Sequence, residues 1–326
     1  MRTPPPSACI GAGRMGRGIA QALAYAGGDI ALVDARARTA AEFEAYRETV
    51  LAEVRDGLAM VAGLGGFDAA RVPALMERVT VHPLAEAAAM GGAEIVFEAV
   101  PEVRDAKAGA FALFDRHGGP GAILASTTST MLATDLAALT AFPERFLNAH
   151  WLNPALLVPL VEVSPCDRTS VKVLARTREI LEALGKVPVV CKASPGYIVP
   201  RIQALAMNEA ARLVEEGVAS AEDVDRAVKY GFGLRFSVLG LLEFIDWGGG
   251  DILYHASRYM AAATGEDRFA PPAIVSDNMQ AGRIGMRSGS GFFDYTHRDV
   301  PAYQRERMGA FLSALRQAGL FRPPAG

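Results

Sequence analysis

The chain has 326 residues, of which 51% are hydrophobic and 21% charged, and its net charge is −3. The arginines are scattered and no basic tail is present, which argues against nucleic acid as a partner. No apolar run approaches the roughly 20 residues of a membrane-spanning helix, and Pro4 to Pro6 stand where a signal peptide needs an apolar segment. We therefore expect neither a nucleic-acid nor a membrane partner.

The length favours two domains, because a single hydrophobic core rarely serves more than about 250 to 300 residues. The three cysteines, Cys9, Cys166 and Cys191, are odd in number and form no C-x-x-C pair. They are typical of small core residues in a reducing cytoplasm, so we expect no disulfide and no metal site.

Residues 7–34 predict a strand, a glycine turn, a helix and a second strand. The turn Gly11-Ala12-Gly13-Arg14-Met15-Gly16 matches G-x-G-x-x-G, and Asp34 ends the second apolar run. In this context the pattern indicates dinucleotide binding, with Gly11 making the turn, Gly13 admitting a pyrophosphate and Gly16 allowing close helix packing. We take Gly11, Gly13, Arg14, Met15, Gly16 and Asp34 as candidate cofactor-binding residues. A structural turn in another α/β protein is the alternative.

Asp34 favours NAD over NADP. A carboxylate at this spacing accepts hydrogen bonds from the adenosine ribose hydroxyls and repels a 2′-phosphate. Arg36 and Arg38 lie close enough in the sequence to soften that preference.

Helical and strand-like segments alternate after Asp34. Helices are predicted at 39–60 and 68–78, and short strands at 79–81, 95–97, 123–125 and 146–148. This order predicts a Rossmann-type, doubly wound and mostly parallel sheet with helices on both faces. A final strand near 187–190 and a linker at 192–196 follow, and the chain beyond Tyr197 is helical. The prediction is an NAD-binding domain over 1–191 and an all-helical substrate-binding and dimerisation domain over 192–326.

Polar residues follow the strands of the predicted sheet, where ligands of such sheets collect. Glu102 and Lys107 come after one strand, the hydroxyl-rich run 126–130 after the next, and His150 and Asn153 after a third. Among the five histidines, only His150 both follows a predicted strand and is itself followed by a polar stretch. A histidine there is suited to take the proton that leaves an alcohol during hydride transfer, and Glu162 is placed to hold its other nitrogen. On spacing alone, a structural histidine beside a chance carboxylate explains the pattern equally well.

The chain resembles the L-3-hydroxyacyl-CoA dehydrogenase family. The resemblance rests on segments in family order along almost the whole chain: GAGRMGRGIA, EAVPE, STTST, NAHWLNP, PLVEV, SPGYIVPR, LEFIDWGGGD and RSGSGFFDY. Members of this family are NAD-dependent and dimeric. The resemblance implies that His150 is the general base and Glu162 its orienting partner. It also implies that Ser129 and Asn153 hold the substrate oxygen and that Glu102 and Lys107 line the nicotinamide end.

Each of these roles has a structural alternative. Ser129 is also suited to cap a helix, Asn153 before a proline to form a turn, Lys107 to sit in solvent, and Glu102 to stabilise a helix start.

The sequence departs from the family at Pro200. The hydroxyacyl-CoA enzymes carry an asparagine there, in a GFIVNR-like run, and proline cannot donate a hydrogen bond. Arg201, a neighbouring loop or a different substrate group would have to replace that contact. In addition, the 39–60 segment offers Arg47 and Arg55 among five acidic residues, whereas lysine-rich helices in the family suit coenzyme A.

We therefore expect an NAD-dependent dehydrogenase of fatty acid metabolism that interconverts a short-chain L-3-hydroxyacyl-CoA and its 3-oxoacyl-CoA, in a cytoplasmic homodimer. The same chemistry on a CoA-free 3-hydroxy acid or related small carboxylate is the alternative. A non-catalytic, crystallin-like NAD-binding protein is a third possibility.

Overall fold

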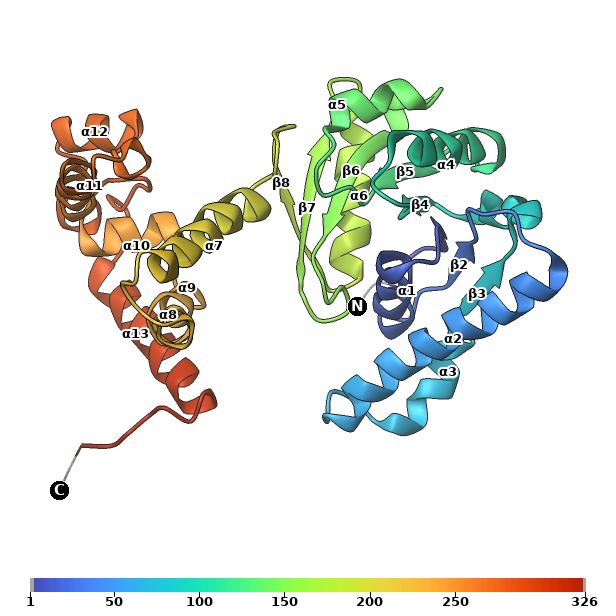
Figure 1. Cartoon of the computed structure of the whole chain (residues 1–326), viewed down its shortest axis with the longest axis horizontal. Coiled ribbons are helices and arrows are strands. Elements are labelled where there is room, and N and C mark those ends of the chain that lie inside the picture. Colours follow the sequence, from blue (N-terminus) through green and yellow to red (C-terminus); the bar gives the residue numbers. More distant parts are fainter. Residues whose placement is uncertain (1–2, 325–326) are drawn as a thin grey trace. The chain divides into compact units, whose positions relative to one another are not determined.

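The computed structural model describes residues 3–324, which form two compact units that divide between Ala206 and Met207. The first unit contains an eight-stranded sheet in the order β3-β2-β1-β4-β5-β6-β7-β8 (Figure 1). Its strands are β1 Ser7–Ile10, β2 Ile30–Val33, β3 Val79–His82, β4 Ile95–Glu98, β5 Ile123–Ser126, β6 Phe146–Trp151, β7 Leu160–Pro165 and β8 Val187–Val190. The helices of this unit are α1 Arg14–Tyr25, α2 Ala40–Gly63, α3 Val72–Met76, α4 Arg104–His117, α5 Ala133–Leu136 and α6 Val171–Ala183.

The predicted doubly wound sheet is confirmed. Alternate residues of the strands point into two separate cores, so that Cys9 faces one core and Ala8 and Ile10 face the other. Helices α1, α2, α3 and α6 cover the first core, while α4, α5 and the short helix Leu84–Gly92 cover the second. Burial on both faces explains why these strands read as continuous apolar runs in the sequence.

The strand at residue 146 is longer than predicted. It was expected over 146–148 with His150 beyond its end, but β6 continues to Trp151 and all six of its residues are buried. It pairs antiparallel with β7, whereas all other neighbouring pairs of the sheet, including β7 and β8, are parallel. His150 therefore lies inside the sheet, in register with Glu162 on the next strand. Pairing with β7 extends the strand to Trp151. The apolar pattern of residues 146–148 alone does not predict this pairing.

Close backbone packing explains two glycines of the first turn. Gly11 has a φ of 101°, and a Cβ there would lie 2.8 Å from the Ala99 carbonyl oxygen. A Cβ on Gly16 would lie 2.0 Å from the Gly11 carbonyl oxygen. No side chain caps the first turn of α1, so its N–H groups remain available to an anion.

The second unit is helical, as predicted for the chain beyond Tyr197. Helix α7, Val199–Glu215, begins in the first unit and continues into the second. It is followed by α8 Ala221–Ala227, the π-helical turn Val228–Gly233, α9 Leu234–Phe236, α10 Leu241–Gly248, α11 Gly250–Thr264, α12 Ala273–Gln280 and α13 Val300–Gln317. The predicted domain boundary after residue 191 falls between β8 and α7 and stays a prediction.

Two sequence segments of the resemblance, LEFIDWGGGD and RSGSGFFDY, pack against each other inside the second unit. The buried Asp246 carboxylate accepts hydrogen bonds from the backbone N–H groups of Phe292 and Phe293. A Cβ on Gly291 would lie 2.1 Å from that carboxylate. Arg287 donates to both carboxylate oxygens of Asp251 at 2.8 Å. These residues stabilise the helical unit.

Candidate active site

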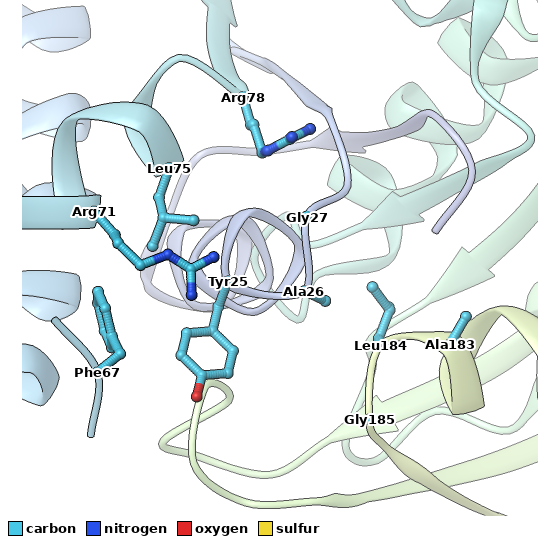
Figure 2. A pocket seen from close by; sticks show the side chains of 10 residues that line it. All are labelled: Tyr25, Ala26, Gly27, Phe67, Arg71, Leu75, Arg78, Ala183, Leu184 and Gly185. Atoms are coloured by element: carbon cyan, nitrogen blue, oxygen red, sulfur yellow. The ribbon is translucent and has the colours of Figure 1, made fainter. Parts of the chain in front are cut away.

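One cleft contains none of the predicted site residues. It has a volume of about 450 Å³ and is lined by Tyr25, Phe67, Leu75, Leu184 and their neighbours (Figure 2). Its lining segments precede β2, β3 and β8 instead of following a strand. Since ligands of doubly wound sheets collect where strands end, this cleft is not the candidate site.

A second cleft, of about 420 Å³, surrounds the glycine turn. Gly11, Gly13 and Arg14 line it, as does Asp34, which directly follows β2. The N–H groups at the start of α1 have no side-chain cap, and Gly11 in the preceding turn leaves no room for a side chain. These residues therefore suit a pyrophosphate. Gly16 does not line this cleft but allows α1 to pack against β1.

Asp34 is buried and already engaged by arginine. One carboxylate oxygen accepts a hydrogen bond from the Arg38 Nε at 2.6 Å, and the other accepts one from the Arg36 backbone N–H at 3.1 Å. The Arg38 guanidinium also stacks on the Tyr46 ring, 4.0 Å from its centroid. The hydrogen bond to Asp34 raises the pKa of Arg38. The expected proximity of these arginines is confirmed, and Arg38 partly neutralises the carboxylate.

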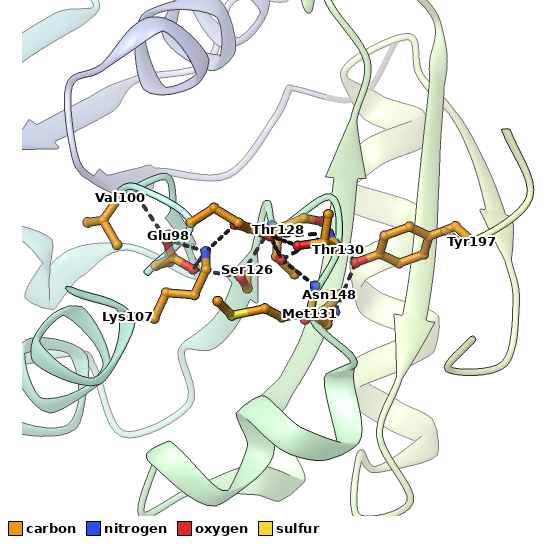
Figure 3. Close-up of polar contacts among 10 residues, drawn as sticks. Glu98, Val100, Lys107, Ser126, Thr128, Thr130, Met131, Asn148 and Tyr197 are labelled. Carbon is orange, nitrogen blue, oxygen red and sulfur yellow. Dashed lines mark hydrogen bonds and ion pairs between the residues drawn. The ribbon is translucent and has the colours of Figure 1, made fainter. Parts of the chain in front are cut away.

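Lys107 is buried in an acidic network beyond the ends of β4 and β5 (Figure 3). Its Nζ lies 3.0 Å from one carboxylate oxygen of Glu98 and 3.1 Å from Glu102. Glu98 also accepts hydrogen bonds from the Ser126 hydroxyl and the Val100 backbone N–H. Lys107 is thus no solvated helix residue, and its ammonium holds two carboxylates together. Sequence reasoning missed Glu98, although a carboxylate at the end of an apolar strand run was a visible signal.

Glu102 is tied to the hydroxyl-rich loop 126–130. Its carboxylate accepts hydrogen bonds from the Thr128 hydroxyl, the Thr130 hydroxyl and the Thr130 backbone N–H. Burial alone would raise the pKa of Glu102, but the hydrogen bonds from both threonines and the charge of Lys107 lower that pKa to about 2. The carboxylate is therefore a fixed negative charge at neutral pH.

His150 and Glu162 form a buried pair across β6 and β7. The His150 Nδ1 lies 2.8 Å from a carboxylate oxygen of Glu162, which is completely buried. The antiparallel register places the two residues directly opposite each other, at the separation where cross-strand side chains interact. The second oxygen of Glu162 accepts hydrogen bonds from the backbone N–H groups of Ile198 and Val199, at 2.9 and 2.8 Å. One carboxylate thus holds both the imidazole and the first turn of α7.

Tyr197 packs against the same imidazole. Its ring lies parallel to that of His150, with 5.0 Å between centroids. Its hydroxyl donates to the Thr128 carbonyl at 2.8 Å and accepts from the Asn148 Nδ2 at 3.0 Å (Figure 3). Tyr197 also has a φ of 45°, which is rare for a residue with a bulky side chain. Sequence reasoning assigned it no role, because all these contacts are remote in sequence.

A third cleft, of about 460 Å³, brings the predicted substrate residues together. Ser129, His150 and Asn153 line it, together with Glu102 and Met15. Arg14 lines both this cleft and the cleft around the glycine turn, so the two meet at the start of α1. Glu162 lies behind His150, and Lys107 behind Glu102. Pro200 and Gln203 of α7 complete the lining. This arrangement suits a proton acceptor beside a dinucleotide site.

Comparison with known proteins places both parts of the sequence in one family. The model of the 3-hydroxyacyl-CoA dehydrogenase NAD-binding domain matches residues 7–194, and the model of the C-terminal domain matches residues 196–295. The chain belongs to the 3-hydroxyacyl-CoA dehydrogenase family. The resemblance drawn from the motifs is confirmed, and the chain is an NAD-dependent dehydrogenase of this family.

Similar members of the 3-hydroxyacyl-CoA dehydrogenase family carry two kinds of name. A 5-formyl-3-hydroxy-2-methylpyridine 4-carboxylate 5-dehydrogenase of Mesorhizobium japonicum is 33% identical over 92% of this chain and 94% of its own length. A probable 3-hydroxybutyryl-CoA dehydrogenase of Bacillus subtilis is 32% identical over 88% of this chain and 96% of its own length. The crystal structure of a 3-hydroxyacyl-CoA dehydrogenase from Archaeoglobus fulgidus is 31% identical and has a TM-score of 0.76, covering 97% of this chain and all of its own.

Within residues 3–324, no helix combines the length and apolar character needed to cross a membrane.

Proposed function

We propose that the chain interconverts a short-chain L-3-hydroxyacyl-CoA and its 3-oxoacyl-CoA, with His150 as the general base. The observation that carries this proposal is the buried contact of 2.8 Å between the His150 Nδ1 and Glu162, on a histidine that lines the cleft with Ser129 and Asn153. Because the Nδ1 is engaged by a carboxylate, the Nε2 is left to receive a proton from the cleft.

Each residue around His150 has a distinct task in this proposal. In the oxidising direction the Nε2 of His150 takes the hydroxyl proton, and Glu162 stabilises the imidazolium that forms. Ser129 and Asn153 hold the substrate oxygen, and Glu102, fixed by Thr128 and Lys107, borders the nicotinamide end. NAD, which the glycine turn and Asp34 would hold, would supply the acceptor for the hydride of the carbon that carries the hydroxyl group. General-base catalysis of this kind contributes about 10²- to 10⁴-fold to the rate.

The deciding experiment is the reduction of acetoacetyl-CoA by NADH, followed by the loss of NADH absorbance. We expect His150→Gln to lower kcat by about 10²-fold or more, because the base is lost. Glutamine has a side chain of similar size, so the packing of the site is largely kept. His117→Gln, at the end of α4, is the control and retains activity. Turnover of His150→Gln close to wild type would exclude His150 as the base.

The CoA-free alternative has its own support. Helix α2 carries Glu42, Glu44, Glu48 and Glu53, which offer little attraction to the phosphates of coenzyme A. The Mesorhizobium relative is named for a pyridine carboxylate, which has no CoA. A direct comparison of acetoacetyl-CoA with a panel of free 3-hydroxy acids and 3-oxo acids separates the two substrates. NADH binding without turnover of any of them would instead favour the non-catalytic, crystallin-like role.

We further propose a cytoplasmic homodimer that acts in fatty acid metabolism, in which the helical domain over 192–326 binds substrate and dimerises. The second unit exposes large apolar side chains at Met207, Tyr230, Ile252 and Tyr259, which a partner surface would cover. The cysteines are unpaired, which suits a reducing compartment. Light scattering after size exclusion measures the oligomeric state, and a monomeric mass at micromolar concentration would contradict the dimer.

A further inference from the structure

Gln203 lines the active-site cleft but has no task in the proposed mechanism. It lies on α7, is exposed, and shares the cleft with His150 and Ser129. Among residues 3–324 its carboxamide has no hydrogen-bond partner. A polar side chain that lines the same cleft as His150 and is not engaged by the protein is free to contact a substrate.

The position of Gln203 is set by the catalytic pair. Glu162 accepts hydrogen bonds from the backbone N–H groups of Ile198 and Val199, where α7 begins. The carboxylate that contacts His150 therefore also fixes the start of this helix. Gln203 is four residues after Val199, which is about 6 Å along the helix axis. Side chains of a helix lean toward its N-terminus, and here that direction leads back to the His150–Glu162 pair.

Pro200 and Gln203 are the two residues of α7 that line the cleft. Their spacing of three residues places them on one face of the helix. Pro200 has neither a backbone N–H nor a polar side chain, so it cannot donate to a substrate. Arg201, which was one expected replacement for a donor at position 200, does not line the cleft. Gln203 is therefore the hydrogen-bonding side chain that α7 presents to this cleft.

The chemistry of the cleft narrows what Gln203 would contact. Glu102 is already engaged by Thr128, Thr130 and Lys107, and the alcohol oxygen is assigned to His150, Ser129 and Asn153. A 3-oxoacyl substrate has one further oxygen-bearing group close to the reacting carbon. This group is a thioester carbonyl in an acyl-CoA and a carboxylate in a free acid. A carboxamide N–H donates to either kind of oxygen.

We propose that Gln203 is a specificity-determining residue whose carboxamide donates a hydrogen bond to the acyl oxygen of the substrate. This is the oxygen of the thioester carbonyl in an acyl-CoA or of the carboxylate in a free acid. This inference rests on the proposed function and deepens it, since it concerns how the same cleft distinguishes its substrates. It also gives a source for the contact that Pro200 cannot make.

The test compares Gln203→Leu and Gln203→Glu with wild type on acetoacetyl-CoA and on free acetoacetate, with NADH as reductant. Leucine keeps the size and helix propensity of glutamine but cannot donate. We expect Gln203→Leu to lower kcat/KM about tenfold on the favoured substrate, since one hydrogen bond to a substrate is lost. The Kd of NADH, measured by fluorescence, stays unchanged. Arg201→Ala is the matched control, is adjacent on the same helix, and retains wild-type kcat/KM.

The loss of kcat/KM on each of the two substrates shows whether Gln203 contacts a thioester carbonyl or a carboxylate. A loss confined to acetoacetyl-CoA assigns the contact to a thioester carbonyl. A loss on acetoacetate that is deeper in Gln203→Glu than in Gln203→Leu assigns it to a carboxylate, because two negative charges then repel.

Wild-type kcat/KM for a folded Gln203→Leu on both substrates, with His150→Gln inactive, would overturn this inference and leave the proposed function standing. Absence of turnover by the wild type on both substrates would instead overturn the proposed function, and this inference with it. Circular dichroism and Tm show that each variant is folded.

Discussion

The His150 and Tyr197 rings lie parallel, with an interplanar angle of 2° and 5.0 Å between their centroids. Glu162 holds one edge of the imidazole, and Tyr197 covers one of its faces. The Tyr197 hydroxyl is in turn held by Asn148 and by the carbonyl of Thr128, next to Ser129. The imidazole and the hydroxyl-rich loop are therefore connected through one tyrosine.

Replacing Tyr197 separates its two contributions. Tyr197→Phe keeps the stacked ring but leaves the Thr128 carbonyl without this donor, and we expect a loss of stability of about 1 kcal/mol with most of the kcat retained. Tyr197→Leu also removes the stack, and we expect kcat to fall about tenfold, because an aromatic pair is worth about 0.5–1.5 kcal/mol and the ring gains freedom. Urea unfolding and steady-state kinetics measure the two effects. Equal kcat in the two variants would show that stacking does not position His150.

Glu162 is expected to serve both catalysis and the start of α7. Glu162→Gln keeps an oxygen that accepts from the Ile198 and Val199 N–H groups, so we expect Tm to change little. The carboxamide presents an NH₂ group to His150 or reverses the tautomer of the imidazole, so we expect kcat to fall about 10²-fold or more. Glu162→Ala leaves the half-buried N–H groups of Ile198 and Val199 without their acceptor and lowers both kcat and Tm. Thermal unfolding followed by circular dichroism separates the variants. A Glu162→Ala protein as stable as wild type would contradict the role in α7.

We expect Asp34 and Arg38 to set the preference between NAD and NADP. Asp34→Ser removes the carboxylate and releases Arg38, which then has a 2′-phosphate as its natural partner. We expect the ratio of kcat/KM for NADP to that for NAD to rise about tenfold or more, since repulsion is lost and an attraction is gained. Asp34→Ser combined with Arg38→Ala should lose the gain for NADP. An unchanged ratio in the single variant would show that Asp34 does not discriminate between the cofactors.

The lowered pKa of Glu102 predicts a pH-dependent contribution to stability. A carboxyl group whose pKa is lower in the folded chain stabilises the fold above its ordinary pKa of about 4.3, and this contribution is lost as the pH falls toward about 2. The Tm of wild type should thus exceed that of Glu102→Gln at about pH 6, and the difference should shrink between about pH 4.5 and pH 3. Glu48→Gln, on the exposed face of α2, is the control. A Tm difference that grows on acidification would contradict the sign.

Gly16 is expected to tolerate no side chain. A Cβ there would lie 2.0 Å from the Gly11 carbonyl oxygen, so Gly16→Ala should displace α1, lower stability by about 1–3 kcal/mol and weaken NAD binding. Gly109→Ala on α4 is the matched control, because nothing lies within 4 Å of its Cβ position, and it should stabilise the chain by about 0.4–1 kcal/mol. Isothermal titration with NAD and urea unfolding measure both. A Gly16→Ala protein that binds NAD as wild type does would contradict the close packing.

The sequence by itself determined the features that depend on neighbours along the chain. The glycine turn, Asp34 at the end of β2 and the alternation of strands and helices follow from local geometry and from the period of apolar residues. The structure confirms this order, although some element bounds differ, as at β6. The family, too, was visible in the order of the motifs. The roles of His150, Glu162, Ser129 and Asn153 came from that resemblance and await the kinetic tests.

Only the tertiary structure decided the contacts between residues far apart in sequence. The extension of β6 to Trp151, the salt bridges of Lys107 with Glu98 and Glu102, the stack of Tyr197 on His150 and the attachment of α7 to Glu162 all join separate segments. Periodicity describes how one segment faces the core, but it carries no information about which segment lies opposite. Gln203 shows the same limit, since only the fold reveals that this helix residue lines the same cleft as His150.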